Sequence, residues 1–128
     1  MRVGFDLDGT LDRPAIATLA RVLMDDGHEV FIVSGVFDES GEWQGVDAKR
    51  RKIKRLGLER AIPIFLHADN VRALSGEQAT LAYRLRTLGL RKGAVCAEEG
   101  IELMFDDSAD YCAMMPKMCG TQIVQVHP

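Results

Sequence analysis

Short apolar runs alternate with helical segments along the whole of this chain. The runs that predict strands are Arg2–Leu7, His28–Ser34, Ile62–Leu66, Ile101–Phe105 and Thr121–Val126. Strands that alternate with helices need right-handed crossovers, and these produce a parallel sheet with helices on both faces. The sequence therefore predicts an α/β fold, a Rossmann-like three-layer sandwich around a mostly parallel five-stranded sheet.

The segments between these runs carry apolar residues at helical spacing. The predicted helices are Arg13–Asp26, Val46–Leu56, 75–88, Gly93–Glu99 and Ala109–Lys117, the last broken at Pro116. Asp12 is the candidate N-cap of the first helix, and Pro14 suits its first turn. Residues 35–45 hold three glycines and are expected to form a loop, and Gly89 is expected to end the helix at 75–88.

Composition limits the class of protein. The chain has 128 residues, 47% of them hydrophobic, and a net charge of −3, which disfavours a general polyanion binder. No apolar run approaches the roughly 18 residues of a membrane span. Three cysteines without a CxxC pair favour a reduced environment. We therefore expect one cytoplasmic domain over residues 1–128, with a small helical insertion at 68–91.

Polar residues end three of the predicted strands. Asp6 and Asp8 follow the first, Ser34 ends the second, and Asp106 and Asp107 follow the fourth. The carboxyl ends of parallel strands meet at one edge of a doubly wound sheet, where ligands bind. Two carboxylates at the end of a buried strand repel each other unless a cation lies between them, and a divalent cation with oxygen ligands fits that place.

These segments resemble the motifs of the haloacid dehalogenase-like hydrolase superfamily, which consists mostly of phosphatases. Asp6-Leu-Asp8-Gly-Thr10 resembles motif one, Phe31-Ile-Val-Ser34-Gly35 resembles motif two, and Leu103-Met-Phe-Asp106-Asp107 resembles the acidic motif four. Motif three is a single Lys, for which Lys92 is the first choice and Lys49 and Lys52 are alternatives. The resemblance covers nearly the whole chain.

The resemblance implies a mechanism for a phosphoric monoester hydrolase. Asp6 would attack phosphorus to give an aspartyl-phosphate, and Asp8 would act as general acid and then base. Mg²⁺ would be held by Asp6, Asp8 through its backbone carbonyl, and Asp106. Ser34 and Lys92 would contact the phosphoryl oxygens. An acid at Asp8 fits an alkoxide leaving group, which favours phosphatase over dehalogenase.

The resemblance also implies which residues would bind the substrate. Gly9, Thr10 and Gly35 would line the phosphate, and Lys49 would open a strongly basic helix beside it. Lys54 and Arg55, farther along that helix, are expected to lie away from the site. Asp107 is interpreted as a helix-capping residue, and the role of Asp110 is left open.

The short segment between Asp8 and Ser34 leaves no room for a large cap domain. The site should therefore be open. By analogy with open members of such a family, it would act on a large substrate or be closed by homo-oligomerisation. The expected partner is a phosphorylated small molecule or a nucleic-acid end. Three alternatives remain. The basic helix would suit a phosphatase of nucleotides or nucleic-acid ends, the same fold could serve as a phosphate-binding regulatory domain, and a receiver domain has the least support.

Overall fold

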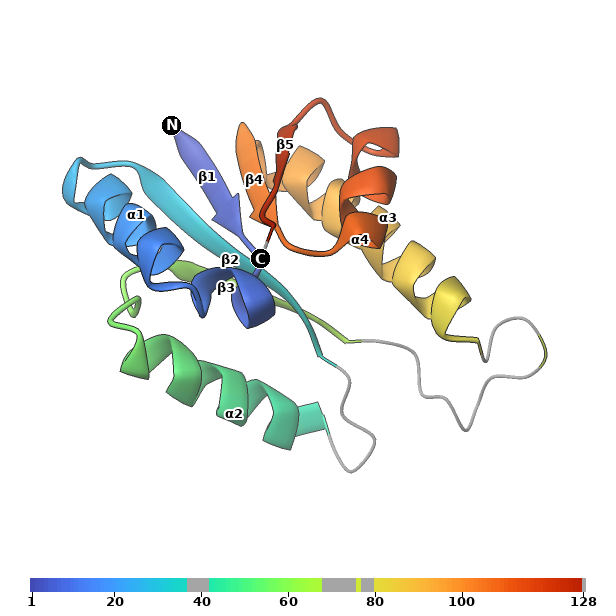
Figure 1. The fold of residues 1–128 in the computed structure, drawn as a ribbon, viewed down its shortest axis with the longest axis horizontal. Coiled ribbons are helices and arrows are strands. Elements are labelled where there is room, and N and C mark those ends of the chain that lie inside the picture. The colour runs from blue at the N-terminus through green and yellow to red at the C-terminus, as the bar shows by residue number, and fades with distance from the viewer. Residues whose placement is uncertain (37–41, 68–75, 77–79, 128) are drawn as a thin grey trace.

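Five parallel strands form one sheet in this computed structural model, which describes residues 1–36, 42–67, 76 and 80–127. The strands are β1 (Arg2–Phe5), β2 (Glu29–Val36), β3 (Ile62–His67), β4 (Leu103–Asp106) and β5 (Gln122–Gln125). Their order across the sheet is β3-β2-β1-β4-β5, and every neighbouring pair is parallel (Figure 1). The predicted α/β sandwich around a parallel five-stranded sheet is confirmed, and the residues that the structure describes form no large cap.

Helices cover both faces of this sheet. They are α1 (Pro14–Asp25), α2 (Glu42–Arg55), α3 (Leu81–Glu99) and α4 (Ala109–Met114), and a 3₁₀ turn at Met115–Lys117 follows α4. Alternate residues of β2 point to opposite faces. Val30 and Ile32 join the core cluster that holds Ala20 of α1 and Ile53 of α2, whereas Phe31 and Val33 join the cluster of α3 and α4.

The α3 helix corrects the expectation of two short helices divided at Gly89. It is one helix of 19 residues that continues through Gly89 and Gly93 and ends at Gly100, whose φ is +64°. A Cβ at Gly93 would lie 2.6 Å from the Met115 carbonyl oxygen. These glycines therefore permit close packing against α4 and the 3₁₀ turn after it instead of ending the helix, a use that periodicity in one segment does not reveal.

Two other boundaries differ from the predictions. The N-cap of α1 is Arg13, without a side-chain hydrogen bond, because Asp12 accepts instead from the Gly9 amide at 2.8 Å. The α2 helix begins at Glu42 and includes Gly45, and β2 continues to Val36, so both ends of the predicted loop are regular structure. The residues between them, 37–41, lie outside the described residues, as do 68–75 and 77–79 of the predicted insertion.

None of the helices within the described ranges is long and apolar enough to cross a bilayer.

Candidate functional site

Strand register brings the predicted acidic residues together at the carboxyl edge of the sheet. Phe5 of β1 pairs with Phe105 of β4, and the Asp6 amide donates to the Phe105 carbonyl at 2.9 Å. Asp6 and Asp106 therefore leave adjacent strands side by side. Ser34 lies in the neighbouring strand β2, where it is 1% exposed.

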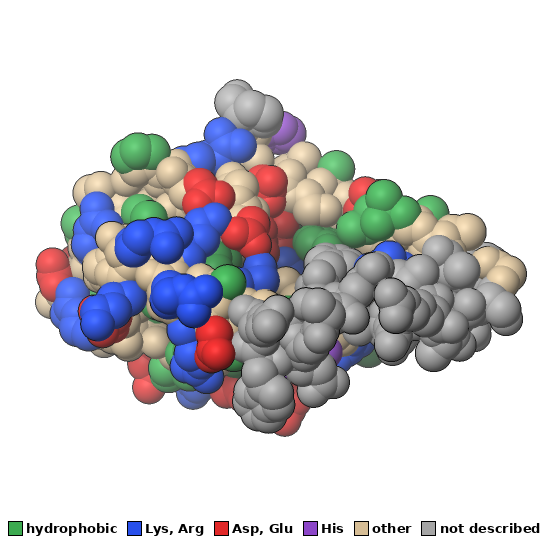
Figure 2. All heavy atoms as spheres, turned by 90° about the horizontal axis from the view of Figure 1, so that it is seen from below, with side chains coloured by type: hydrophobic (Ala, Val, Ile, Leu, Met, Phe, Trp, Pro, Cys, Tyr) green, Lys and Arg blue, Asp and Glu red, His purple; other side chains and the backbone are tan. Residues whose placement is uncertain are grey.

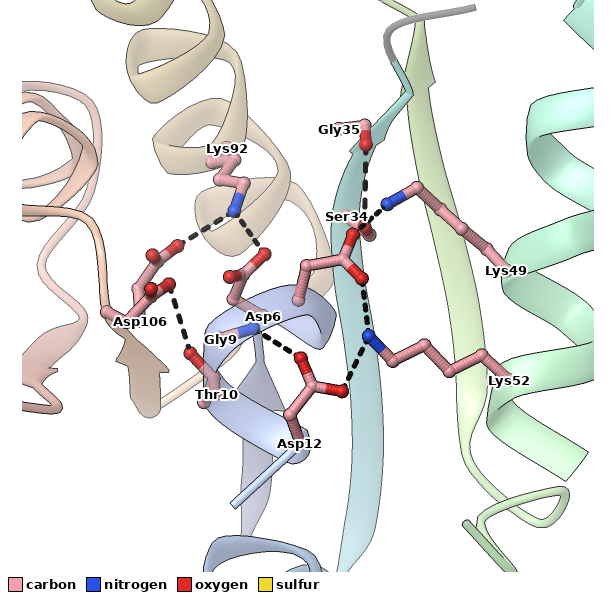
Figure 3. Close-up of polar contacts among 12 residues, drawn as sticks. Asp6, Gly9, Thr10, Asp12, Ser34, Gly35, Lys49, Lys52, Lys92 and Asp106 are labelled. Atoms are coloured by element: carbon pink, nitrogen blue, oxygen red, sulfur yellow. Dashed lines mark hydrogen bonds and ion pairs between the residues drawn. The ribbon is translucent and has the colours of Figure 1, made fainter. Parts of the chain in front are cut away.

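Lys92 lies between two of these carboxylates. Its Nζ donates to Asp6 Oδ1 at 2.9 Å and to Asp106 Oδ2 at 2.8 Å (Figure 3). Both Lys92 and Asp106 are completely buried, and Asp6 is 6% exposed. The ammonium group also lies 4.4 Å from the centre of the Tyr111 ring, close enough for a cation–π contact. The helix α3 thus delivers a fixed positive charge beneath the sheet edge.

Burial and the neighbouring charges shift the pKa values of the buried groups. Burial raises the pKa of Asp6 to about 7, against the attraction of Lys92 and with the repulsion of Asp106. Burial alone would lower the pKa of Lys92, but the two carboxylates raise it. Lys92 is therefore a permanent cation, while the Asp6 carboxyl holds its proton more tightly than usual, first because it is buried and second because Asp106 lies beside it.

Asp107 completes a group of three carboxylates. One oxygen from each of Asp6, Asp106 and Asp107 lies within 4.8 Å of the other two. We call these three residues the acidic cluster. Their hard oxygen donors suit Mg²⁺ or Ca²⁺ rather than a soft metal. With every group ionised, three carboxylates and the Lys92 ammonium leave two net negative charges, the charge that a divalent cation balances.

The turn after β1 depends on a glycine. Gly9 has a φ of +81°, which favours glycine, and a Cβ there would lie 2.2 Å from Asp107 Oδ2. The next residue, Thr10, is buried and its hydroxyl donates to Asp107 Oδ1 at 3.4 Å. Gly9 and Thr10 therefore position the acidic cluster, beside any part they have in holding a ligand.

Asp8 turns toward the opposite side of the site. Its carboxylate pairs with Lys49 through Oδ2 and with Lys52 through Oδ1, the latter at 2.6 Å. Lys52 also contacts Asp12 at 2.5 Å. We call Lys49 and Lys52 the α2 clamp. Burial opposes the shift, but hydrogen bonds from the two lysines lower the pKa of Asp8 below its ordinary value.

A cavity of about 690 Å³ lies between the acidic cluster and α2. We call it the edge cavity, and Figure 2, seen from the α2 side, shows Lys and Arg side chains gathered next to acidic ones. Its lining includes two carboxylates of the first motif, the end of β2 and four cations of α2: Asp6, Asp8, Ser34, Gly35, Lys49, Arg51, Lys52 and Arg55, together with Asp107 and Tyr111.

The predicted site residues thus lie in one region. Lys92 lies beside Asp6 and Asp106, whereas Lys49 and Lys52, the alternatives for motif three, lie on the α2 side. Arg55 lines the cavity, which corrects the expectation that it lies away from the site, and Lys54 lines a separate hollow.

Asp107 is not the N-cap of α4 that was expected, because the Ser108 side chain accepts from the Tyr111 amide instead. Asp110 lies in the exposed first turn of α4.

Sequence reasoning missed Arg51, Arg55 and Tyr111 as lining residues. The signal for the arginines was their helical spacing: Arg55 follows Lys52 by three residues and Arg51 by four, so these side chains share one face of α2. Tyr111 carried no such signal, because its position depends on how α4 packs against α3.

Comparisons with known proteins bear on the family. No family model matches the sequence. No curated protein matches it either. Among solved structures, a universal stress protein in complex with cAMP is similar over 99% of this chain and 96% of its own, with 12% identity and a TM-score of 0.54. A protein from the universal stress protein family of Burkholderia pseudomallei gives 14% identity over the same shares and a TM-score of 0.52.

These neighbours contradict the expected haloacid dehalogenase-like family. The predictions of a hydrolase, a phosphatase and an aspartyl-phosphate intermediate are wrong with it, as are the alternatives built on the same family. The physical reason is that Asp-x-Asp-Gly-Thr is a short motif of turn-forming residues, and a strand end in a doubly wound sheet accommodates it without that chemistry. At these identities the similarity shows the fold alone.

Proposed function

We propose that this chain binds a small molecule bearing a phosphate group, of the nucleotide class, in the edge cavity together with a divalent cation. The proposal rests on one observation: a group of cationic side chains and a group of carboxylates line opposite sides of the same cavity. Four cations of α2 lie on one side, and Asp6 and Asp107 of the acidic cluster lie on the other. A phosphate group shared between lysines and a bound cation has its charge neutralised from both sides.

The size of the cavity agrees with a ligand of this class. About 690 Å³ falls within the range of small-molecule sites, about 300–1,000 Å³. A solved structure of similar fold is described as a complex with cAMP, which is itself a nucleotide. The carboxyl edge of a doubly wound sheet is also where such ligands are commonly bound.

The cation would be held by the acidic cluster. Thr10 and Ser108 fix two of its carboxylates: the Thr10 hydroxyl contacts Asp107, and the Ser108 amide donates to Asp106 Oδ1 at 2.9 Å. Lys92 occupies one oxygen each of Asp6 and Asp106. Asp6 Oδ2 and Asp107 Oδ2 accept none of these hydrogen bonds, and Asp106 Oδ1 keeps a second lone pair. All three carboxylates could therefore contribute to holding Mg²⁺, whose chemistry there would be to attract and orient phosphate oxygens.

Calorimetric titration with ADP in Mg²⁺ buffer tests this proposal. Wild-type protein should bind ADP, and Lys49→Gln should weaken binding about 10- to 100-fold, because a hydrogen bond to a charged group contributes about 1.5–3 kcal/mol. Lys54→Gln is the matched control: it removes the same charge from the same helix but outside the edge cavity. Absence of ADP binding, or equal loss in both variants, would contradict the proposal.

A further inference from the structure

The α2 clamp already holds an anion. Each oxygen of the Asp8 carboxylate contacts a different lysine, Oδ2 with Lys49 and Oδ1 with Lys52. In Figure 3 both lysines extend from α2 toward the carboxylate that lies between them. A phosphate group also offers two oxygens on one central atom, so it can make the same pair of contacts.

We infer that the α2 clamp is the phosphate subsite of the edge cavity, and that the Asp8 carboxylate occupies it until a ligand displaces it. This inference rests on the proposed function and adds to it the position of the phosphate and an internal competitor. Asp8 would then be neither a metal ligand through its side chain nor a contact to the bound ligand.

Exposure shows which partner is able to move. The Asp8 side chain is 56% exposed, whereas those of Lys49 and Lys52 are 16% and 22% exposed. A displaced carboxylate can rotate into water at little cost in free energy, because it is already half hydrated. The lysines stay in place against the protein.

Asp12 has the opposite role from Asp8. Its Oδ1 contacts Lys52 at 2.5 Å, while its Oδ2 accepts from the Gly9 amide at 2.8 Å. The backbone bond fixes this carboxylate in the turn after β1, so it continues to orient Lys52 when Asp8 leaves. The clamp is therefore preorganised for an incoming anion, which limits the entropy lost on binding.

An internal competitor weakens ligand binding by a factor that depends on how often it occupies the subsite. If Asp8 leaves the clamp open about one-tenth of the time, the apparent affinity falls about tenfold. Asp8→Asn removes the charge and keeps the shape, so it should tighten ADP binding about tenfold. Asp25→Asn is the control, because it removes one carboxylate from an exposed pair with Arg60.

A double-mutant cycle separates displacement from simple repulsion. If Asp8 and the ligand share the clamp, the gain from Asp8→Asn should largely vanish in a Lys49→Gln background. Calorimetry with ADP and Mg²⁺ on the four proteins, with thermal unfolding as the check on folding, measures this. No gain from Asp8→Asn, or a gain that persists undiminished without Lys49, would overturn the inference while the proposed function stands. If no protein of the cycle binds ADP, the proposed function fails as well.

Discussion

Two carboxylates two residues apart meet opposite surroundings in this molecule. Asp6 ends a central strand and faces Lys92 inside the protein, whereas Asp8 lies in the following turn and faces Lys49 and Lys52 near solvent. Burial raises the pKa of Asp6 to about 7 even beside an ammonium group, while the two lysines lower that of Asp8. Dehydration therefore outweighs pairing on the buried side, and pairing outweighs it on the exposed side.

The buried side should be the more sensitive to mutation. Lys92→Met keeps a side chain of similar length but removes the ammonium between Asp6 and Asp106. The free energy of unfolding should fall by about 3–5 kcal/mol, as it does when one partner of a buried ion pair is removed. Denaturant unfolding measures it, with the exposed Lys117→Met as control. A loss below about 1 kcal/mol would show that the buried charges contribute as little as surface pairs.

A divalent cation should compensate the excess negative charge on the buried side. Mg²⁺ at about 100 times its dissociation constant should raise the free energy of unfolding by about 2.7 kcal/mol, and chelation should remove the gain. Asp107→Asn should abolish most of this effect. Asp110→Asn, an exposed neighbour outside the acidic cluster, should leave it intact. Equal responses of the two variants to Mg²⁺ would place the cation elsewhere.

The position of Lys92 depends on the close approach of α3 to α4. At Gly93 a Cβ would lie 2.6 Å from the Met115 carbonyl oxygen and 3.0 Å from its Cα, both backbone atoms. Gly93→Ala should destabilise the fold by about 1–3 kcal/mol through overpacking, despite the better helix propensity of alanine. Gly120→Ala, where a Cβ meets no atom within 4 Å, is the control. Unchanged stability of Gly93→Ala would mean that α3 is free to shift.

The exposed side should contribute little to stability. Asp8→Asn breaks two ion pairs with a half-exposed carboxylate, so the free energy of unfolding should change by about 1 kcal/mol or less. Differential scanning calorimetry against wild type checks it. A loss as large as that of Lys92→Met would remove the distinction between the two sides and identify Asp8 as a structural residue.

The sequence predicted the sheet and its polar edge because both follow from local patterns. Alternating apolar runs determined the fold class, and parallel strands necessarily gather Asp6, Ser34 and Asp106 at one edge. The sequence did not predict those features that depend on contact with a residue far away in the chain. Gly89 and Gly93 look like helix ends until α4 is packed against them, and Asp107 looks like a cap until Gly9 and Thr10 approach it. The predicted family was wrong for another reason: the motifs behind the resemblance are short runs of residues at strand ends, and the strand ends of other doubly wound sheets can carry the same residues.

A crystal structure with ADP and Mn²⁺ would place the cation and the phosphate group in one experiment, because Mn²⁺ takes the oxygen ligands of Mg²⁺ and can be located by anomalous scattering. We expect manganese among Asp6, Asp106 and Asp107, a phosphate group on Lys49 and Lys52, and the Asp8 side chain turned away from both lysines. Manganese bound elsewhere, or a nucleotide seated away from α2 with Asp8 still in the clamp, would contradict this expectation.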